Sequence, residues 1–243
     1  MALCEAVHVV KRFDGVAALD GVSLRLEPAA ITALIGPNGS GKTTLLNLLG
    51  GQLRPSAGSV RWRSEDITRW PVYRRCRAGI TRTFQVAQPF QDLSLLENVR
   101  LGALFGGPAA SRSQHEVTAR AQRLLEDLGL STRADTRAGD LSLGDLKRLE
   151  LAMALSTQPS LLLVDEILAG QSPSSIEGLL ACLGALRSQG LAILLVEHRL
   201  QALMRTADRV VALHQGRIIA EGAPDAVLRT PAVVEAYLGE PLP

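Results

Sequence analysis

The sequence predicts an α/β fold with a mixed, mainly parallel sheet, and two observations support this expectation. An apolar run at 30–35 is followed by a glycine-rich stretch at 36–43 and by a second apolar run at 44–49. This order is typical of a buried strand, a loop and a buried helix. Two more apolar runs, at 161–164 and 191–196, show no alternation with polar residues. Such runs are typical of parallel strands that are buried on both faces.

The residues before the glycine-rich stretch predict an N-terminal antiparallel β subdomain. Residues 3–10 and 16–28 read as two strands joined by the turn 13–15, and 58–62 reads as a return strand. Phe13 is one of only four phenylalanines and lies in the predicted turn. It is either a hydrophobe that anchors this turn to the surface or a platform on which a nucleotide base stacks.

The glycine-rich stretch carries the strongest motif in the chain. It fits G-x-x-x-x-G-K-[ST] with Gly36, Pro37, Asn38, Gly39, Ser40, Gly41, Lys42 and Thr43, and Thr44 follows. Its glycines let the backbone N–H groups turn inward toward an anion, and the start of the next helix adds further N–H groups. A glycine-rich turn without a ligand is the alternative, but the full pattern and both flanking runs favour binding of a nucleoside triphosphate. Lys42 is then predicted to reach the β- and γ-phosphates, and the Thr43 hydroxyl to contact Mg²⁺.

Polar residues follow the predicted core strands where ligands usually bind, at the carboxyl ends. Asp165 and Glu166 end the run that begins at Ser160. Asp165 suits a contact with Mg²⁺, and Glu166 suits a base that activates water; solvated loop acids are the alternative. His198 follows the next strand and is either structural or able to sense a γ-phosphate. Gln85 ends a strand predicted over 80–84.

From about 89 to 150 the pattern becomes helical. Apolar residues recur at three- and four-residue spacing over 95–104 and 117–128. Ser142 and Asp145 then have the spacing of a helix N-terminal cap, beside Gly144. Such a helix start is either only a cap or a second place where a phosphate can dock. We therefore expect an inserted helical subdomain.

The remaining segments complete the predicted fold. A helix is expected over 173–187, a hairpin over 209–220 and one or two short helices over 224–239. Residues 70–77 interleave arginines with aromatic residues, which favours a solvated helix face over binding of single-stranded nucleic acid.

Composition narrows the function classes. The chain has 243 residues, 47% of them hydrophobic, and a formal net charge of only +2, which does not suggest a nucleic-acid-binding protein. The three cysteines have no metal-ligand spacing, which suits buried thiols in a reducing compartment. The N-terminus lacks the pattern of a signal peptide, and no apolar run reaches about 18 residues. We expect a cytosolic protein whose membrane role, if any, depends on a partner.

The order of these motifs resembles that of an ABC-type ATPase over nearly the whole chain. By this resemblance the glycine-rich loop is the Walker A motif, Gln85 the Q-loop, 141–145 the signature, 161–166 the Walker B motif and His198 the switch histidine. The resemblance implies one domain, 1–243, with a P-loop ATPase core at 1–88 and 151–223. The helical signature subdomain would occupy 89–150, and a short C-terminal helical tail 224–243.

Shorter matches point to one branch of that family. Residues 81–85, 97–99, 149–152 and 236–240 resemble the ATP-binding subunits of branched-chain amino acid importers. Importers of urea or amides and the lipopolysaccharide-exporting ATPase are similar there. The resemblance implies an ATP hydrolase that powers such an importer. Two alternatives are the ATPase of a lipid exporter and a soluble ABC ATPase of DNA repair or translation. The near-neutral charge and the lack of a second ATPase half disfavour the soluble ABC ATPase.

The resemblance also implies cofactors and partners. ATP and Mg²⁺ would be bound, with Thr43, Gln85 and Asp165 at the metal and with Lys42, Gln85, Glu166 and His198 in catalysis. Two ATPase subunits, identical or homologous, would enclose two ATP molecules, so that Ser142 and Gly144 of one contact the γ-phosphate held by the other. The helical block and Gln85 would contact integral membrane transporter subunits at the cytoplasmic face of the inner membrane. An external substrate-binding protein would select the cargo, and no nucleic acid is expected.

Three single positions and one loop depart from the family pattern. Asp145 stands where a glutamine is usual in the signature, and Ile167 where a proline follows Walker B. The loop at 169–173 lacks the usual leucine and the usual aspartate or asparagine, and Arg199 replaces an aspartate. None of these changes removes a predicted catalytic group, so we expect an active enzyme.

Overall fold

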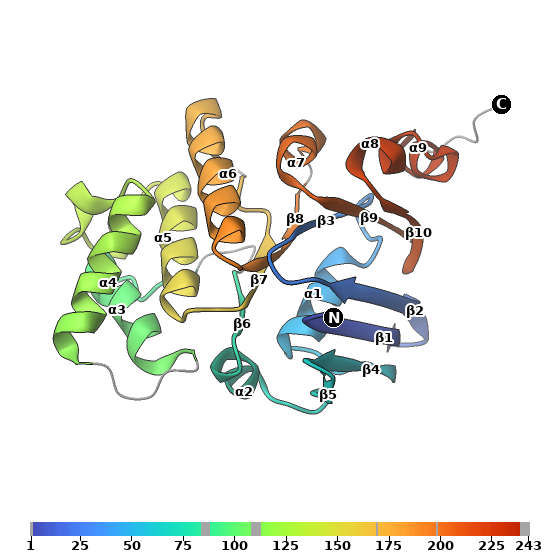
Figure 1. Cartoon of the computed structure of the whole chain (residues 1–243), viewed down its shortest axis with the longest axis horizontal. Helices are drawn as coiled ribbons and strands as arrows, with labels where there is room; N and C mark the ends of the chain where they lie inside the picture. The colour runs from blue at the N-terminus through green and yellow to red at the C-terminus, as the bar shows by residue number, and fades with distance from the viewer. Residues whose placement is uncertain (1, 84–87, 108–112, 169, 198, 239–243) are drawn as a thin grey trace.

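The computed structural model describes residues 2–83, 88–107, 113–168, 170–197 and 199–238. Two sheets lie beside each other, and a helical block lies to one side of them (Figure 1). The predicted α/β fold, with its antiparallel N-terminal part, mixed sheet and helical insertion, is confirmed. Among the described residues, no helix is both long and apolar enough to cross a bilayer.

The N-terminal sheet has four antiparallel strands in the order β2-β1-β4-β5. Its strands are β1 (Cys4–Phe13), β2 (Val16–Leu26), β4 (Ala57–Trp62) and β5 (Glu65–Asp66). The prediction that Phe13 lies in a turn was wrong, because Phe13 ends β1 and pairs with Val16. Asp14 and Gly15 both adopt positive φ angles, of 45° and 88°, and such two-residue turns let the strand pairing continue to the turn itself.

The second sheet has six strands in the order β10-β9-β3-β8-β7-β6. Five strands are parallel, and β10 at one edge is antiparallel to β9. The strands are β3 (Ile31–Ile35), β6 (Ile80–Arg82), β7 (Leu161–Asp165), β8 (Ala192–Val196), β9 (Arg209–His214) and β10 (Arg217–Gly222). Because β3, β7 and β8 are parallel neighbours or next neighbours, their carboxyl ends lie at one edge of the sheet.

Helices follow most of the core strands and also form the separate block. The helices are α1 (Lys42–Gly50), α2 (Val72–Arg77), α3 (Leu95–Phe105), α4 (Gln114–Asp127), α5 (Leu143–Ser156), α6 (Pro173–Ser188), α7 (Leu200–Thr206), α8 (Pro224–Leu228) and α9 (Pro231–Leu238). Two 3₁₀ turns lie at Ser131–Arg133 and Ala138–Asp140. Serine side chains cap the helices of the block, at Ser94, Ser113 and Ser142. Neither β5 nor α7 was predicted from the sequence.

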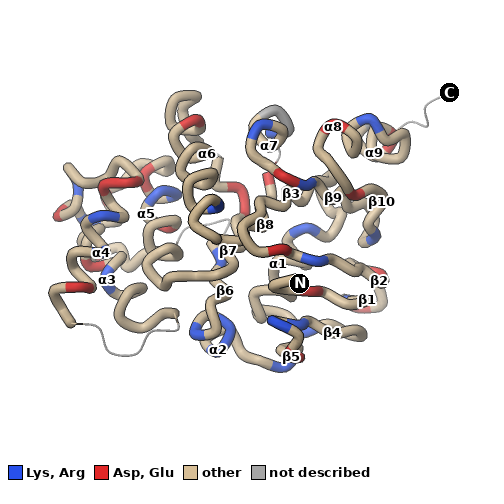
Figure 2. Tube along the Cα trace, viewed as in Figure 1, with Lys and Arg blue, Asp and Glu red and all other residues tan. Residues whose placement is uncertain are grey.

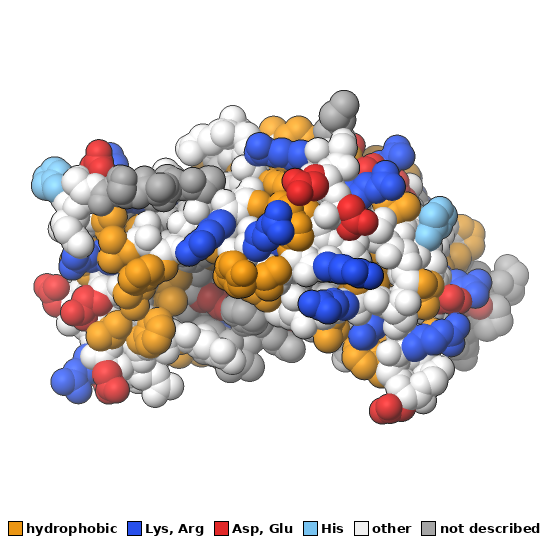
Figure 3. All heavy atoms as spheres, turned by 90° about the horizontal axis from the view of Figure 1, so that it is seen from below, with side chains coloured by type: hydrophobic (Ala, Val, Ile, Leu, Met, Phe, Trp, Pro, Cys, Tyr) orange, Lys and Arg blue, Asp and Glu red, His pale blue; other side chains and the backbone are white. Residues whose placement is uncertain are grey.

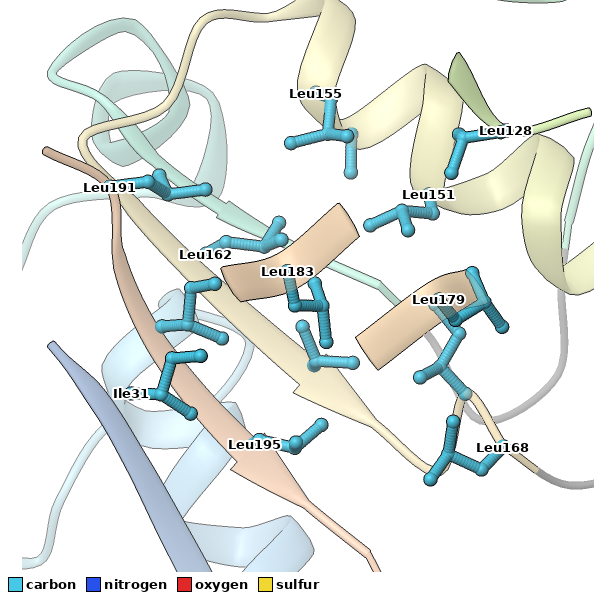
Figure 4. Packing of buried hydrophobic residues seen from close by; sticks show 14 of the residues in the cluster. Ile31, Leu128, Leu151, Leu155, Leu162, Leu168, Leu179, Leu183, Leu191 and Leu195 are labelled. Carbon is cyan, nitrogen blue, oxygen red and sulfur yellow. The ribbon is translucent and has the colours of Figure 1, made fainter. Parts of the chain in front are cut away.

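The six-stranded sheet separates two hydrophobic cores. Along β7, Leu162 and Val164 belong to the core shared with the helices of the block and α6, whereas Leu161 and Leu163 belong to the core shared with α1 and the N-terminal sheet. Figure 4 shows side chains of α5 and α6, such as Leu155 and Leu183, pointing toward Leu162 of the sheet. Every residue of β3, β7 and β8 is buried, as the unbroken apolar runs predicted.

The arginine-rich helix α2 differs in one residue from the solvated face that was predicted. Arg74 stacks over the Trp70 ring at 3.9 Å from its centroid, and both Arg74 and Arg77 are exposed. Arg75 is fully buried, so the prediction was wrong for this side chain. It donates hydrogen bonds to the carbonyl oxygens of Leu48 and Leu49, at 2.6 and 2.8 Å.

These two carbonyls belong to the last turn of α1, where an α-helix leaves its carbonyl groups without helical partners. The Arg75 guanidinium satisfies them, and its charge suits the negative end of the helix dipole. A further bond from its Nη2 to the Ile67 carbonyl, at 2.8 Å, joins the segment before α2 to the same group. Arg75 is therefore a buried C-terminal cap for the helix that follows the glycine-rich loop.

We expect Arg75→Met to lower the free energy of unfolding by about 2–3 kcal/mol. The Leu49 carbonyl would lose its donor, and a buried acceptor left without one costs about 1–3 kcal/mol. The Leu48 carbonyl would keep only the long bond from the Gly51 N–H, at 3.3 Å. For a chain of this length the change corresponds to a fall of about 4–12 °C in Tm. Thermal and urea unfolding of the purified chain measure it. Arg74→Met is the matched control, because this neighbouring arginine is exposed. Equal stability of the two variants would contradict the capping role.

Candidate nucleotide-binding site

The glycine-rich loop joins β3 to α1 and approaches other backbone segments closely. A Cβ atom added to Gly36 would lie 2.1 Å from the carbonyl oxygen of Leu213, so a larger residue does not fit there. Gly41, at φ 108°, precedes α1, and no side chain caps this helix. Among the described residues, the first helical turn thus has no side-chain cap for its N–H groups, which is the condition under which a helix start binds an anion.

The loop and the start of α1 line a pocket of about 240 Å³. The pocket is bordered by residues from three parts of the chain: Ala18, Asn38, Gly39, Ser40, Gly41, Lys42, Thr43, Thr44 and Glu166. The structure thus brings Glu166 to the loop, more than a hundred residues away in the sequence. A larger depression of about 570 Å³ lies elsewhere, beside Arg120, Asp127 and Gln189. The predicted site residues do not line it.

Lys42 lies over the loop from which it starts. Its Nζ donates to the carbonyl oxygens of Gly36 and Pro37 at 2.7 and 2.9 Å, and its side chain is buried. Burial lowers the pKa of Lys42, and the carboxylates of Glu166 and Asp165 oppose this by their negative charge. The ammonium group is therefore within electrostatic reach of both predicted acids.

Asp165 ends β7 and is held by residues that the sequence analysis did not assign to the site. Its N–H donates to Thr83 Oγ1 at 3.2 Å, and its Oδ2 accepts from Arg82 Nη2 at 2.9 Å. Arg82 also donates to Asn47 of α1, so its guanidinium connects α1, β6 and β7. Burial raises the pKa of Asp165, and the charge of Arg82 opposes this increase.

The second carboxylate oxygen of Asp165 is the observation that bears on a metal ion. Oδ1 is buried and has no hydrogen-bond partner among the described residues. Buried polar atoms are nearly always satisfied, and an ion or a water molecule is one explanation for an exception. An anionic oxygen and the Thr43 hydroxyl are also the oxygen ligands that Mg²⁺ prefers. The residues present therefore fit the predicted metal.

Glu166 follows Asp165 with a backbone conformation that is unusual for a residue with a side chain. Its φ angle is 51°, and its N–H donates to the carbonyl oxygen of Val196 at 3.0 Å. Such strain persists only where the surrounding structure imposes it, and it is concentrated at functional sites. The pairing with β8 thus turns the chain so that Glu166, and not the next apolar residue, borders the pocket.

Phe13 lies outside the pocket lining. Its ring is 43% exposed, and Lys11 Nζ lies 4.9 Å from the ring centroid. The Phe13 ring is therefore accessible at the end of β1, which is compatible with a surface anchor for the turn and with a platform for a nucleotide base.

The predicted signature begins α5. Ser142 caps the helix by accepting from the N–H of Asp145 at 3.2 Å, as the spacing predicted. The Asp145 carboxylate is buried and ion-paired with Arg133, at 2.7 Å, and with Arg148. Asp145 is thus oriented into its own subdomain. Leu143, in contrast, is 58% exposed.

The loop that departs from the family pattern contacts the signature. Gln171 is buried, and its Nε2 donates to the carbonyl oxygen of Gly144 at 2.9 Å. The Gln171 side chain thus joins this loop to the first turn of α5. Ser172 caps α6 by accepting from the N–H of Ser175.

Two predicted site residues, Gln85 and His198, lie outside the described residues and stay predictions. Their described neighbours are fixed in the core. Thr83 bonds to Asp165, and the Glu197 carboxylate accepts from the N–H of Leu168 at 2.7 Å.

Sequence reasoning missed Arg82, Gln171 and Tyr237, which all contact predicted site residues. Arg82 had a usable signal, because a basic residue at the end of a predicted core strand faces the same sheet edge as the acids. The other two had none in the residue pattern. Tyr237 reaches the loop from a helix that is 201 positions away in the sequence.

Comparison with known proteins agrees with this architecture. Residues 19–169 match the family model of the ABC transporter, and residues 217–242 match that of the branched-chain amino acid ATP-binding cassette transporter. The chain is 36% identical to the high-affinity branched-chain amino acid transport ATP-binding protein BraF of Pseudomonas aeruginosa, over 98% of each chain.

Solved structures give the same result. An ATP-binding cassette of an ABC transporter in its ADP conformation superposes with a TM-score of 0.87 and 35% identity, covering 99% of this chain and 100% of that one. A dimeric cassette in a post-hydrolysis state, bound to ADP and phosphate, superposes with a TM-score of 0.84 and 25% identity, over 91% and 98% of the two chains.

The fold and the loop, together with these matches, define the class of an ATP-hydrolysing transporter subunit. The chain belongs to the ABC transporter family, in the branch of the branched-chain amino acid transport ATP-binding proteins. The predicted family and branch are confirmed.

Proposed function

We propose that this chain binds and hydrolyses ATP to power the import of branched-chain amino acids or related small amides. The observation that carries the proposal is the pocket in which the glycine-rich loop, Lys42 and Glu166 meet. Its cargo class is inferred from the full-length similarity to BraF. The volume is below the 300–1,000 Å³ or so of pockets that enclose a small molecule, which suits a site for the phosphates alone.

In this proposal separate residues of the chain bind the phosphates, hold the metal ion, accept the proton and contact the base. The N–H groups of the loop and Lys42 bind the β- and γ-phosphates. Thr43 and Asp165 hold Mg²⁺, with Gln85, and the ion supplies neutralising charge to the phosphate oxygens. Glu166 accepts a proton from the attacking water, and His198 contacts the γ-phosphate. Phe13 offers its exposed ring to the base.

We infer that a second ATPase subunit completes each site. The described residues that line the pocket come from 18, 38–44 and 166, and none from the signature at 141–145. The exposure of Ser142 and Leu143 supports a role for this turn at a subunit contact, with Ser142 and Gly144 reaching the phosphate of the opposite subunit. The partner is a second copy of this chain or a homologous subunit.

We also infer the face on which the membrane subunits dock. Apolar side chains are exposed on α2, on α3 and between them, and such groups mark interaction surfaces. They are Val72, Tyr73, Phe90, Leu104 and Phe105. Figure 3 shows hydrophobic and basic side chains together on the face seen from below, to which α2 belongs. Docking there would hold the chain at the cytoplasmic face of the inner membrane. The membrane subunits would meet an external binding protein at the opposite face.

Charge supports protein partners over nucleic acid. Basic and acidic residues are interspersed along the described chain (Figure 2), and the formal net charge is +2. Arg74 and Arg77 of α2, where the local basic signal is strongest, lie over the rings of Trp70 and Tyr73. The Trp70 ring is therefore covered on one side by the chain's own arginine, whereas Tyr73 is 65% exposed.

Co-purification with the membrane subunits tests the proposal. We expect the wild-type chain to be recovered with them in detergent, and the double variant Tyr73→Asp, Phe105→Asp to be lost from the complex while it still binds ATP. Val16→Asp is the matched control, because Val16 is 71% exposed at the far end of the N-terminal sheet. Recovery with ribosomes or DNA in place of membrane subunits would reject a transport role.

A further inference from the structure

The C-terminal part of the chain, from β9 onward, contacts the backbone of the glycine-rich loop. The loop follows β3, and these contacts come from the β9 side of that strand, whereas β8 lies on its other side. The turn between β9 and β10 supplies the first contact, because the N–H of Gly216 donates to the carbonyl oxygen of Ser40 at 3.0 Å. The end of β9 supplies the second, since Leu213 packs so closely that only glycine fits at position 36.

The third contact comes from α9. The N–H of Gly36 donates to the Tyr237 hydroxyl oxygen at 2.8 Å. The helix that carries this tyrosine is anchored, because Val233 is 2% exposed and belongs to the same core as Val210 of β9. The hydroxyl is therefore placed by a packed helix and not by a free chain end.

Gly36 is a sensitive place for such a contact. It is the first residue of the loop whose N–H groups are proposed to bind the phosphates, and glycine loses more backbone freedom on ordering than any other residue. A loop that is ordered before its ligand arrives loses less conformational entropy on binding, so preorganisation increases affinity. Both ends of the stretch 36–40 are bonded to the C-terminal part of the chain.

We propose that Tyr237 is a positioning residue for nucleotide binding, whose hydroxyl fixes the Gly36 amide and so preorganises the glycine-rich loop. The inference rests on the proposed nucleotide site. It also gives a physical role to the segment 217–242, which matches the branch-specific family model. This segment starts with β10, directly after Gly216, and includes Tyr237.

The test compares the full-length chain with its Tyr237→Phe variant, which keeps the ring and removes only the hydroxyl. We expect the Mg²⁺ complex of a non-hydrolysable ATP analogue to bind about two- to tenfold more weakly, the effect of one net hydrogen bond. KM for ATP should rise by the same factor, with kcat at saturating ATP unchanged. Amide exchange of Gly36, followed by NMR on the nucleotide-free chain, should become faster.

Tyr73→Phe is the matched control for nucleotide binding by the isolated chain, where no membrane subunit is present. The chain contains only these two tyrosines, and Tyr73 is 65% exposed on α2, outside the pocket lining. Equal affinity and equal Gly36 exchange in the wild type and Tyr237→Phe would overturn the inference, even if the variant melted at a lower temperature. Absence of analogue binding by the wild-type chain would instead reject the proposed nucleotide site. The two failures are thus distinguishable.

Discussion

Glu166→Gln is expected to reduce ATP turnover by about 10²–10⁴-fold, the usual contribution of a positioned general base. The Glu166 carboxylate borders the pocket at the glycine-rich loop, and an amide of the same shape cannot accept the proton of the attacking water. Nucleotide binding should persist, because the backbone bond from the N–H of Glu166 to Val196 does not depend on the side chain. Lys42 also keeps its bonds to the loop in this variant.

Phosphate release under saturating ATP and calorimetric affinity for ATP separate the two effects. Size-exclusion chromatography with ATP should also show the variant as a trapped dimer, since hydrolysis no longer releases the closed form. Glu177→Gln serves as the control, because Glu177 is exposed on α6. Normal turnover in Glu166→Gln would reject Glu166 as the base.

Lys42→Ala is expected to weaken ATP binding by about 10–100-fold, since a hydrogen bond to a charged group contributes about 1.5–3 kcal/mol. The change has a second effect on the empty site. The positive charge of Lys42 would no longer oppose the negative charges of Asp165 and Glu166, so these acids would repel the triphosphate more strongly. The loss should therefore be larger at low ionic strength, where charges are screened less.

Calorimetry with Mg²⁺-ATP at two salt concentrations measures both effects. Lys42→Met keeps most of the side-chain volume and should bind as weakly as Lys42→Ala. Thermal unfolding of each variant shows whether the loop and α1 remain folded. Unchanged affinity in folded Lys42→Ala protein would count against the phosphate-binding role of the loop.

The fold was predictable because its signals are local. The apolar runs of β3, β7 and β8 are buried throughout, and the loop motif lies between the strand and helix that it requires. The serine cap of α5 was also predictable, because both of its partners lie within one turn.

Contacts between distant segments were not predictable in this way. The sequence around Arg75 predicts a solvated side chain. Its burial depends on two carbonyl acceptors in α1, which lie 26 and 27 positions earlier in the sequence. Phe13 was predicted to lie in the turn, but it still belongs to β1 because the turn consists of Asp14 and Gly15 alone. A turn this short depends on the backbone angles of these two residues, which the residue pattern does not give. The Arg82 bridge and the Tyr237 bond depend on elements that only the fold brings together. Gln85 and His198 stay predictions.

The two cores on either side of the six-stranded sheet restrict how β7 can change in evolution. Side chains alternate strictly along this strand, so inserting or deleting one residue would exchange Leu161 and Leu163 with Leu162 and Val164 between the two cores. The same slip would carry Asp165 away from its pairing with Val196 and turn Glu166 from the pocket. Substitutions within the strand are therefore tolerable where volume is kept, whereas length changes are not. Packing far from the predicted nucleotide site thus fixes the positions of Asp165 and Glu166.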